Sequence, residues 1–122
     1  MTSGKRGEAV PRPTKKTEYQ LVFCSREAVK GWQDCLAAVR NAVVEAYDRL
    51  TQAPEGETQR QYPLRADFAT GSYGGVTYDR WQYKISDGGR LWYFVDHTAT
   101  GSRAGRVLIE RAEPGHPKGT ET

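Results

Sequence analysis

The stretch WQYKISDGGRLWYFV, residues 81–95, decides the fold. Apolar and polar residues alternate from Trp81 to Ile85, which is the period of a strand with one buried face. The four residues SDGG at 86–89 contain an Asp-Gly pair, which is typical of a tight hairpin because glycine adopts positive φ angles without steric cost. Residues 90–96 are apolar on both faces. The stretch therefore predicts two antiparallel strands, the second at the centre of a sheet.

Before this hairpin, the chain changes from a strand to helices. YQLVFC at 19–24 is an apolar, β-branched run that predicts a strand, and Ser25 is a suitable helix N-cap. A stripe with spacings of three and four follows, formed by Trp32, Leu36, Val39, Val43, Tyr47 and Leu50. Gly31 is expected to divide a short first helix from a longer second one, which ends in TQAPEGETQ at 51–59. The sequence thus predicts an antiparallel helix pair.

Further strands are expected on both sides of the hairpin. RVLIER at 106–111 predicts a last strand, and YPLRADFATGSYGG at 62–75 predicts a less regular, bulged strand with glycine interruptions. VTYDRWQYKI at 76–85 is interpreted as one continuous strand with a partly cationic second face. This order indicates an α+β fold, with an N-terminal strand and a two-helix hairpin packed on an antiparallel sheet of four to five strands.

The length of 122 residues favours one domain. We expect a disordered basic tail at 1–18, a single domain at 19–118 and a short tail at 119–122. No apolar run is long enough to span a membrane and no signal peptide is recognised, so a cytoplasmic protein is expected. Cys24 and Cys35 are interpreted as small core residues, and no metal or organic cofactor is expected. The sequence leaves the oligomeric state open.

The formal net charge of +3 is unevenly distributed along the chain. Residues 1–18 carry five Lys or Arg against two Glu, and residues 60–118 carry nine Lys or Arg against six Asp or Glu. A basic surface attracts phosphate backbones through counterion release, so nucleic acid is the first partner to consider. The alternative interpretation is ordinary solubilising charge.

Three motifs and the element order resemble the RelE/ParE superfamily of toxins from type II toxin–antitoxin systems, with the RelE/YoeB-like branch favoured. The motifs are PLR at 63–65, WQYKISDGGRLWYFV at 81–95 and VLIERAEPGHPK at 107–118. The resemblance implies a ribosome-dependent mRNA endoribonuclease that inhibits translation, with a cognate antitoxin, the ribosome and mRNA as partners. Two alternatives stay open: a ParE-like inhibitor of DNA gyrase without catalysis, and a non-toxic interaction module of the same fold.

The resemblance also carries individual residues. Arg90 in GRLWY matches the arginine that precedes an apolar strand in the ribonuclease branch, and Arg65 in PLR matches a basic residue after Pro-Leu. Lys84 in YKI matches a second basic residue before the hairpin, and His116 in PGHPK falls within one residue of a C-terminal His or Tyr. Tyr62 stands where YoeB-like members carry a Glu before Pro-Leu. Pro117 replaces their C-terminal Tyr.

Metal-independent cleavage of RNA by its own 2′-hydroxyl needs that hydroxyl deprotonated, the phosphorane charge stabilised and the leaving 5′-oxygen protonated. Arginine binds two phosphate oxygens in a planar fork, so Arg90 and Arg65 are expected to stabilise the transition state. The imidazole of His116 suits proton transfer near neutrality, although a surface histidine without a role is the alternative. Arg111, at the end of the last strand, is a further candidate.

A second set of residues is expected to bind RNA without taking part in catalysis: Arg80, Lys84, Tyr78 and Lys118. The cations would contact phosphates and the aromatic ring would stack on a base. For Arg80 and Lys84 the alternative is the solvated face of a sheet. For Arg90 it is a strand-edge residue paired with Asp87 or Asp79.

Overall fold

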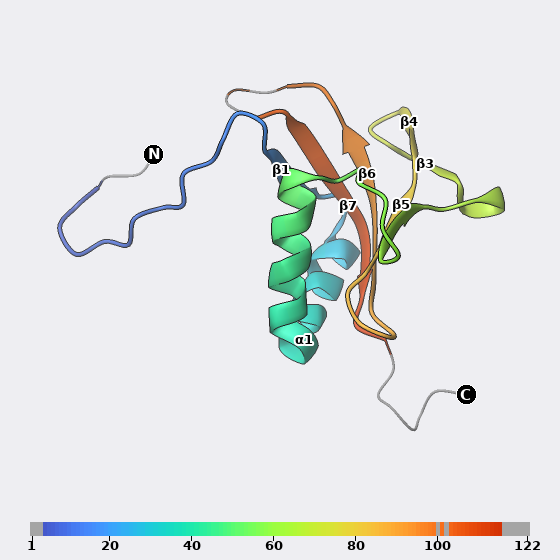
Figure 1. Ribbon diagram of the computed structural model, residues 1–122, viewed down its shortest axis with the longest axis horizontal. Coiled ribbons are helices and arrows are strands. Elements are labelled where there is room, and N and C mark those ends of the chain that lie inside the picture. The colour runs from blue at the N-terminus through green and yellow to red at the C-terminus, as the bar shows by residue number, and fades with distance from the viewer. Residues whose placement is uncertain (1–3, 100, 102, 116–122) are drawn as a thin grey trace.

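The computed structural model describes residues 4–99, 101 and 103–115. A five-stranded sheet carries the helix on one face and a two-stranded sheet on the other (Figure 1). The elements in chain order are β1 (Tyr19–Phe23), α1 (Arg26–Gln52), β2 (Gln61–Pro63), the short 3-10 helix η1 (Ala66–Phe68), β3 (Thr70–Tyr73), β4 (Val76–Asp79), β5 (Trp81–Lys84), β6 (Arg90–Asp96) and β7 (Gly105–Glu113).

The hairpin of β5 and β6 is confirmed as the centre of the large sheet. The strand order is β1-β7-β6-β5-β2, and Lys84 lies opposite Arg90 across the hairpin. Its turn is longer than the expected Asp-Gly turn, as shown by the amide of Ile85, which donates to the carbonyl of Gly89 at 3.0 Å. Gly88 and Gly89 are not among the glycines with positive φ, so the expectation about this turn's backbone is wrong.

The large sheet is mixed, which corrects the expectation of an antiparallel sheet. β1 pairs parallel with β7, with Tyr19 opposite Gly105 and Phe23 opposite Ile109, whereas the other neighbours pair antiparallel. The amide of Cys24 extends this pairing by donating to the carbonyl of Ile109 at 2.9 Å. The first strand of the chain, β1, therefore lies beside the last, β7.

The expected helical stretch is present as the element α1, in which two helical segments meet at a kink. Ser25 is its N-cap as expected, and its hydroxyl accepts from the amide of Ala28 at 3.1 Å. The expected division at Gly31 is wrong, because the helical geometry is interrupted at Val39, with φ −145° and ψ 56°. The rings of Trp32 and Tyr47 lie 6.4 Å apart, although these residues would be separated by about 22 Å along a straight helix. Helix α1 therefore folds back at Val39 (Figure 1).

Residues 62–85 contain a hairpin that the sequence interpretation missed. Gly74 and Gly75 have φ angles of 60° and 80° and form the turn between β3 and β4. The expected single strand over 76–85 is divided at Arg80, and β4 leaves the large sheet to pair with β3 alone. The expectation of a bulged strand here is corrected to a separate two-stranded sheet.

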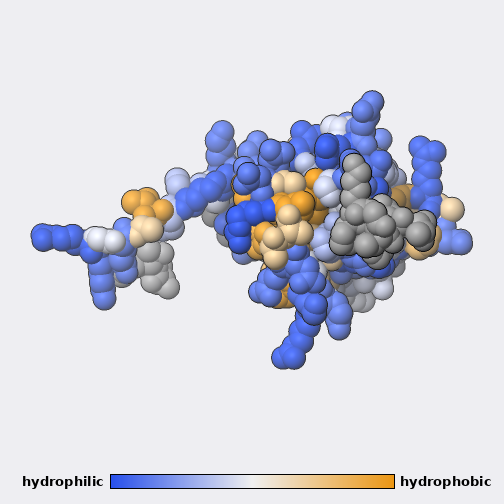
Figure 2. All heavy atoms as spheres, turned by 90° about the horizontal axis from the view of Figure 1, so that it is seen from below, coloured by the Kyte–Doolittle hydropathy of each residue, from blue (hydrophilic) through white to orange (hydrophobic). Residues whose placement is uncertain are grey.

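The core lies between α1 and the large sheet. Leu91, Tyr93 and Val95 of β6 face it, together with Trp81, which is 7% exposed. The hydroxyl of Tyr93 donates to the carbonyl of Pro54 at 2.7 Å, and burial raises the pKa of this phenol. Seen from below, the surface is mostly hydrophilic, with a limited hydrophobic area near its middle (Figure 2). Within the described residues, no helix is long and apolar enough to cross a membrane.

Candidate functional site

The outer face, defined here as the face of the large sheet opposite α1, carries a fixed row of polar and aromatic side chains. Tyr62, Gln82, Trp92 and Arg111 are neighbours across four strands. The amide nitrogen of Gln82 donates to the hydroxyl of Tyr62 at 2.9 Å, and the indole N–H of Trp92 donates to Gln82 at 2.8 Å. These bonds fix the indole ring of Trp92 in the middle of the outer face.

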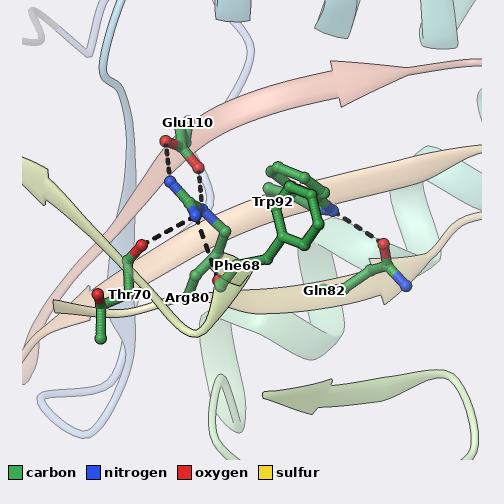
Figure 3. A network of polar contacts seen from close by, with 6 residues as sticks. All are labelled: Phe68, Thr70, Arg80, Gln82, Trp92 and Glu110. Carbon is green, nitrogen blue, oxygen red and sulfur yellow. Dashed lines mark hydrogen bonds and ion pairs between the residues drawn. The ribbon is translucent and has the colours of Figure 1, made fainter. Parts of the chain in front are cut away.

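Arg80 clamps the segment of η1 and β3 onto this face (Figure 3). Its Nε and Nη2 donate to the two carboxylate oxygens of Glu110 at 2.7 and 2.8 Å. Its Nη1 donates to the carbonyls of Phe68 and Thr70 at 3.2 and 2.9 Å. The hydrogen bonds to Glu110 raise the pKa of Arg80, which therefore stays charged. One guanidinium, from the junction of β4 and β5, thus contacts both β7 and the start of the small sheet.

A β-bulge places the carboxylate of this clamp. Trp92 lies opposite Arg111 and Tyr93 lies opposite Ile109, so Glu110 is an extra residue in β7. A bulge turns a side chain away from the regular alternation of a strand. Its carboxylate lies within hydrogen-bonding distance of Arg80, 30 residues earlier in the chain.

The Arg80 clamp supplies a testable contribution to stability. Hydrogen bonds to charged groups contribute about 1.5–3 kcal/mol each, and the side chain of Arg80 is only 13% exposed. In the Arg80→Ala variant, water can hydrate the carboxylate of Glu110, which offsets part of the loss of these bonds. We therefore expect Arg80→Ala to lower the free energy of unfolding by about 2 kcal/mol in urea titrations. Arg111→Ala removes an exposed ion pair with Glu113 and should cost less than about 1 kcal/mol. Equal losses in the two variants would contradict the clamp.

Aromatic rings connect the small sheet to the outer face. The ring of Tyr78 stacks on Phe94 at 5.5 Å with an interplanar angle of 16°. The ring of Phe68 lies 5.5 Å from Trp92. Tyr78, expected to stack on a base, is half-buried between the two sheets.

Lys84 and Arg90 are brought together at the hairpin end of the outer face. The Nη1 of Arg90 donates to the carbonyls of Ser86, Asp87 and Gly89, each at 3.0 Å. The ammonium of Lys84 lies 5.7 Å from the ring of Tyr62. A hollow of about 250 Å³ opens here, and its lining consists of Gln59, Arg60, Lys84, Ser86, Asp87 and Arg90.

Arg60 is a member of this cluster that the sequence interpretation missed. Its Nη1 donates to the carbonyl of Lys84 at 2.9 Å. Within the described residues, no carboxylate forms an ion pair with Arg60, Lys84 or Arg90, so the alternative pairing of Arg90 with Asp87 or Asp79 is not observed. No local sequence signal marks Arg60, because its place beside Lys84 depends on the pairing of β2 with β5.

Arg65 lies elsewhere on the molecule. It is exposed and precedes η1, and the amide of Leu64 beside it bonds to the carbonyl of Arg80 at one end of β5. Arg90 lies opposite Lys84 at the other end of β5, about 13 Å along the strand. Arg65 is not part of the lining of the hollow beside Arg90.

Of the remaining expected site residues, Arg111 lies within the described part of the chain. Arg111 is exposed, is paired with Glu113 and lies with its guanidinium 5.4 Å from the centre of the Trp92 ring. His116, Pro117 and Lys118 lie outside the described residues, so their expected roles stay predictions.

The thiols and acidic groups form no candidate metal site in the described part of the chain. No group of three His, Cys, Asp or Glu residues there is placed to hold a metal ion. Cys35 is fully buried and Cys24 is half-buried, and burial raises the pKa of each thiol to about 11. Both thiols are therefore neutral near pH 7.

Comparison with known proteins identifies the fold. No family model matches the chain, and no curated protein matches it. Among solved structures, a YoeB/ParE toxin from Agrobacterium tumefaciens matches with a TM-score of 0.53, over 80% of this chain and 99% of that chain, at 17% sequence identity. This chain has the YoeB/ParE toxin fold.

A second YoeB structure supports the same fold. A YoeB dimer from Staphylococcus aureus matches with a TM-score of 0.51, at 17% identity, over 80% of this chain and 97% of that chain. The YoeB/ParE toxin fold confirms the RelE/ParE-like architecture expected from the motifs at 63–65 and 81–95.

Proposed function

We propose that this protein is the toxin of a toxin–antitoxin pair and stops translation by cutting mRNA on the ribosome. The observation that carries the proposal is the cluster of Arg60, Lys84 and Arg90 around one hollow, without a carboxylate partner in the described residues. Cations held on a rigid sheet are suited to bind a phosphate and to stabilise charge that develops on it. The fold shared with the structures of a YoeB dimer and a YoeB/ParE toxin supports the same function.

The proposed chemistry is metal-independent attack of the 2′-hydroxyl on the adjacent phosphate. The Nη1 of Arg90 is held by its own hairpin, while Nε and Nη2 have no hydrogen bond to the described residues. These two nitrogens can bind two phosphate oxygens in a planar fork. Lys84 supplies a second positive charge beside it. We assign the proton transfers to His116 and a weaker phosphate contact to Arg65.

The expected RNA-binding residues differ in how available they are. Arg80 already uses Nε, Nη1 and Nη2 in the clamp, so a phosphate would compete with Glu110 for it. Lys84 is free of ion pairs within the described part of the chain and is the principal phosphate contact that we propose. Tyr78, Lys118 and Arg111 stay predicted contacts. The proposed antitoxin covers the same cations with acidic side chains.

Labelling of growing cells after induction tests this function. Incorporation of labelled methionine should fall before that of labelled thymidine, and the new 5′ ends of cellular mRNA should lie at a fixed position within codons. An early loss of thymidine incorporation with an SOS response would instead support inhibition of gyrase. Unchanged incorporation of both labels would support a non-toxic module of this fold.

A further inference from the structure

We propose that Phe68 on η1 is a stacking platform for one base of single-stranded RNA whose phosphate lies at Lys84 and Arg90. The inference rests on the proposed function and adds a base contact to its phosphate contacts. Phe68 is 54% exposed, although its ring lies 5.5 Å from that of Trp92 on the outer face. An exposed aromatic ring beside cations is the arrangement that binds single strands, because every base has a π face.

The ring of Phe68 is supported on one side. It lies 5.5 Å from the ring of Trp92, tilted by 56°. Trp92 is fixed in turn by its hydrogen bond to Gln82 and by the guanidinium groups of Arg80 and Arg111, which lie 5.2 and 5.4 Å from its centre. Because its support is rigid, Phe68 loses little conformational entropy when a base stacks on it.

The backbone that presents Phe68 is both strained and clamped. Ala66, the first residue of η1, has a φ of 56°, which is unfavourable for any residue with a β-carbon. Arg80 holds the carbonyl of Phe68 at 3.2 Å, and the amide of Phe68 donates to the carbonyl of Arg65 at 3.2 Å. Strained residues persist where surrounding contacts hold them, and they concentrate at functional sites.

Trp92, which supports the ring of Phe68, lies on the same face of the sheet as the phosphate cluster. Trp92 lies opposite Gln82, and Arg90 lies opposite Lys84 two residues away on the same strands, which is about 7 Å. Phe68 lies 5.5 Å from Trp92 and is held by Arg80 at the other end of β5, so the bound strand must extend across Trp92 to reach Lys84 and Arg90. Other exposed large apolar residues lack this neighbourhood: Phe23, for example, packs against Trp32 at the opposite edge of the sheet.

The test compares binding of two fluorescently labelled six-nucleotide RNAs by anisotropy, one intact and one in which every nucleotide is abasic. Phe68→Leu keeps an apolar contact with Trp92 but removes the planar face. It should weaken binding of the intact RNA about tenfold and leave binding of the abasic RNA nearly unchanged. Phe68→Tyr should retain wild-type binding of both RNAs.

Phe23→Leu, at an aromatic residue that is also exposed, is the matched control and should bind both RNAs as the wild type does. Wild-type affinity of Phe68→Leu for the intact RNA would overturn the platform. So would the absence of measurable binding by the wild type, or an equal loss for the intact and abasic RNAs.

Methionine labelling separates this inference from the proposed function. If the wild type arrests translation and Phe68→Leu binds RNA and arrests translation equally well, the platform is contradicted and the proposed nuclease is not. A wild type that shows base-dependent binding through Phe68 but leaves translation unchanged supports the platform and contradicts the nuclease.

Discussion

Gly31→Ala is expected to lower the free energy of unfolding by about 3 kcal/mol, which is a large fraction of the stability of a domain of this size. A β-carbon added at Gly31 would lie 2.0 Å from the carbonyl oxygen of Ala112 and 3.0 Å from its carbonyl carbon. Both are backbone atoms of β7, which lies between β1 and β6 in the sheet. The new methyl group must therefore push the first part of α1 away from the core.

The sign of this effect distinguishes close packing from helix propensity. In an exposed helix interior, glycine to alanine stabilises by about 1 kcal/mol, so an increase in stability would contradict the close contact. Urea titration of the purified protein measures the difference. Ala37→Gly, at an exposed position of the same helix, is the control and should cost about 1 kcal/mol.

Local patterns were sufficient for the centre of the fold. The alternation from Trp81 to Ile85 and the apolar run at 90–96 depend on burial of single strands, and both strands are confirmed. The position of Lys84 opposite Arg90 does not follow from the expected turn, because a two-residue Asp-Gly turn would place Ile85 opposite Arg90. The two strands that carry these cations were therefore readable in the sequence, whereas their register was not.

The parts that were missed depend on distant contacts. The parallel pairing of β1 with β7 joins residues at opposite ends of the chain, and no local pattern reports strand direction. The break at Val39 has no glycine or proline to mark it. The turn at Gly74 and Gly75 did carry a local signal, a Gly-Gly pair between polar strands, which was interpreted as an interruption of one strand.

The arrangement of the outer face was missed because it also depends on contacts between residues that are distant in the sequence. The clamp joins Arg80 to Glu110 through a bulge whose position the alternation of β7 does not show. Arg80 was therefore expected to bind RNA, with a solvated position on the sheet as the alternative, although its side chain is only 13% exposed. The strained Ala66 that presents Phe68 was also missed, because alanine carries no sequence signal for a positive φ.

Arg90→Ala is expected to reduce the rate of mRNA cleavage on programmed ribosomes by about 10²- to 10³-fold, as the loss of one charge-stabilising contact does elsewhere. The measurement is primer extension on purified ribosomes with a defined mRNA. Arg90→Lys keeps the charge but cannot bind two phosphate oxygens in a plane, so an intermediate rate is expected. Arg40→Ala, which removes an exposed arginine from α1, should leave the rate within about twofold of the wild type.

A loss of activity through unfolding is distinguishable from a loss of chemistry. The Nη1 of Arg90 bonds only backbone carbonyls of its own turn, two of which belong to Asp87 and Ser86 near the surface. Water can replace these bonds, so Arg90→Ala should cost less than about 1 kcal/mol of stability. If Arg90→Ala has the melting temperature of the wild type and also cleaves at the wild-type rate, Arg90 takes no part in catalysis. A charge that stabilises the transition state cannot be deleted without slowing the reaction.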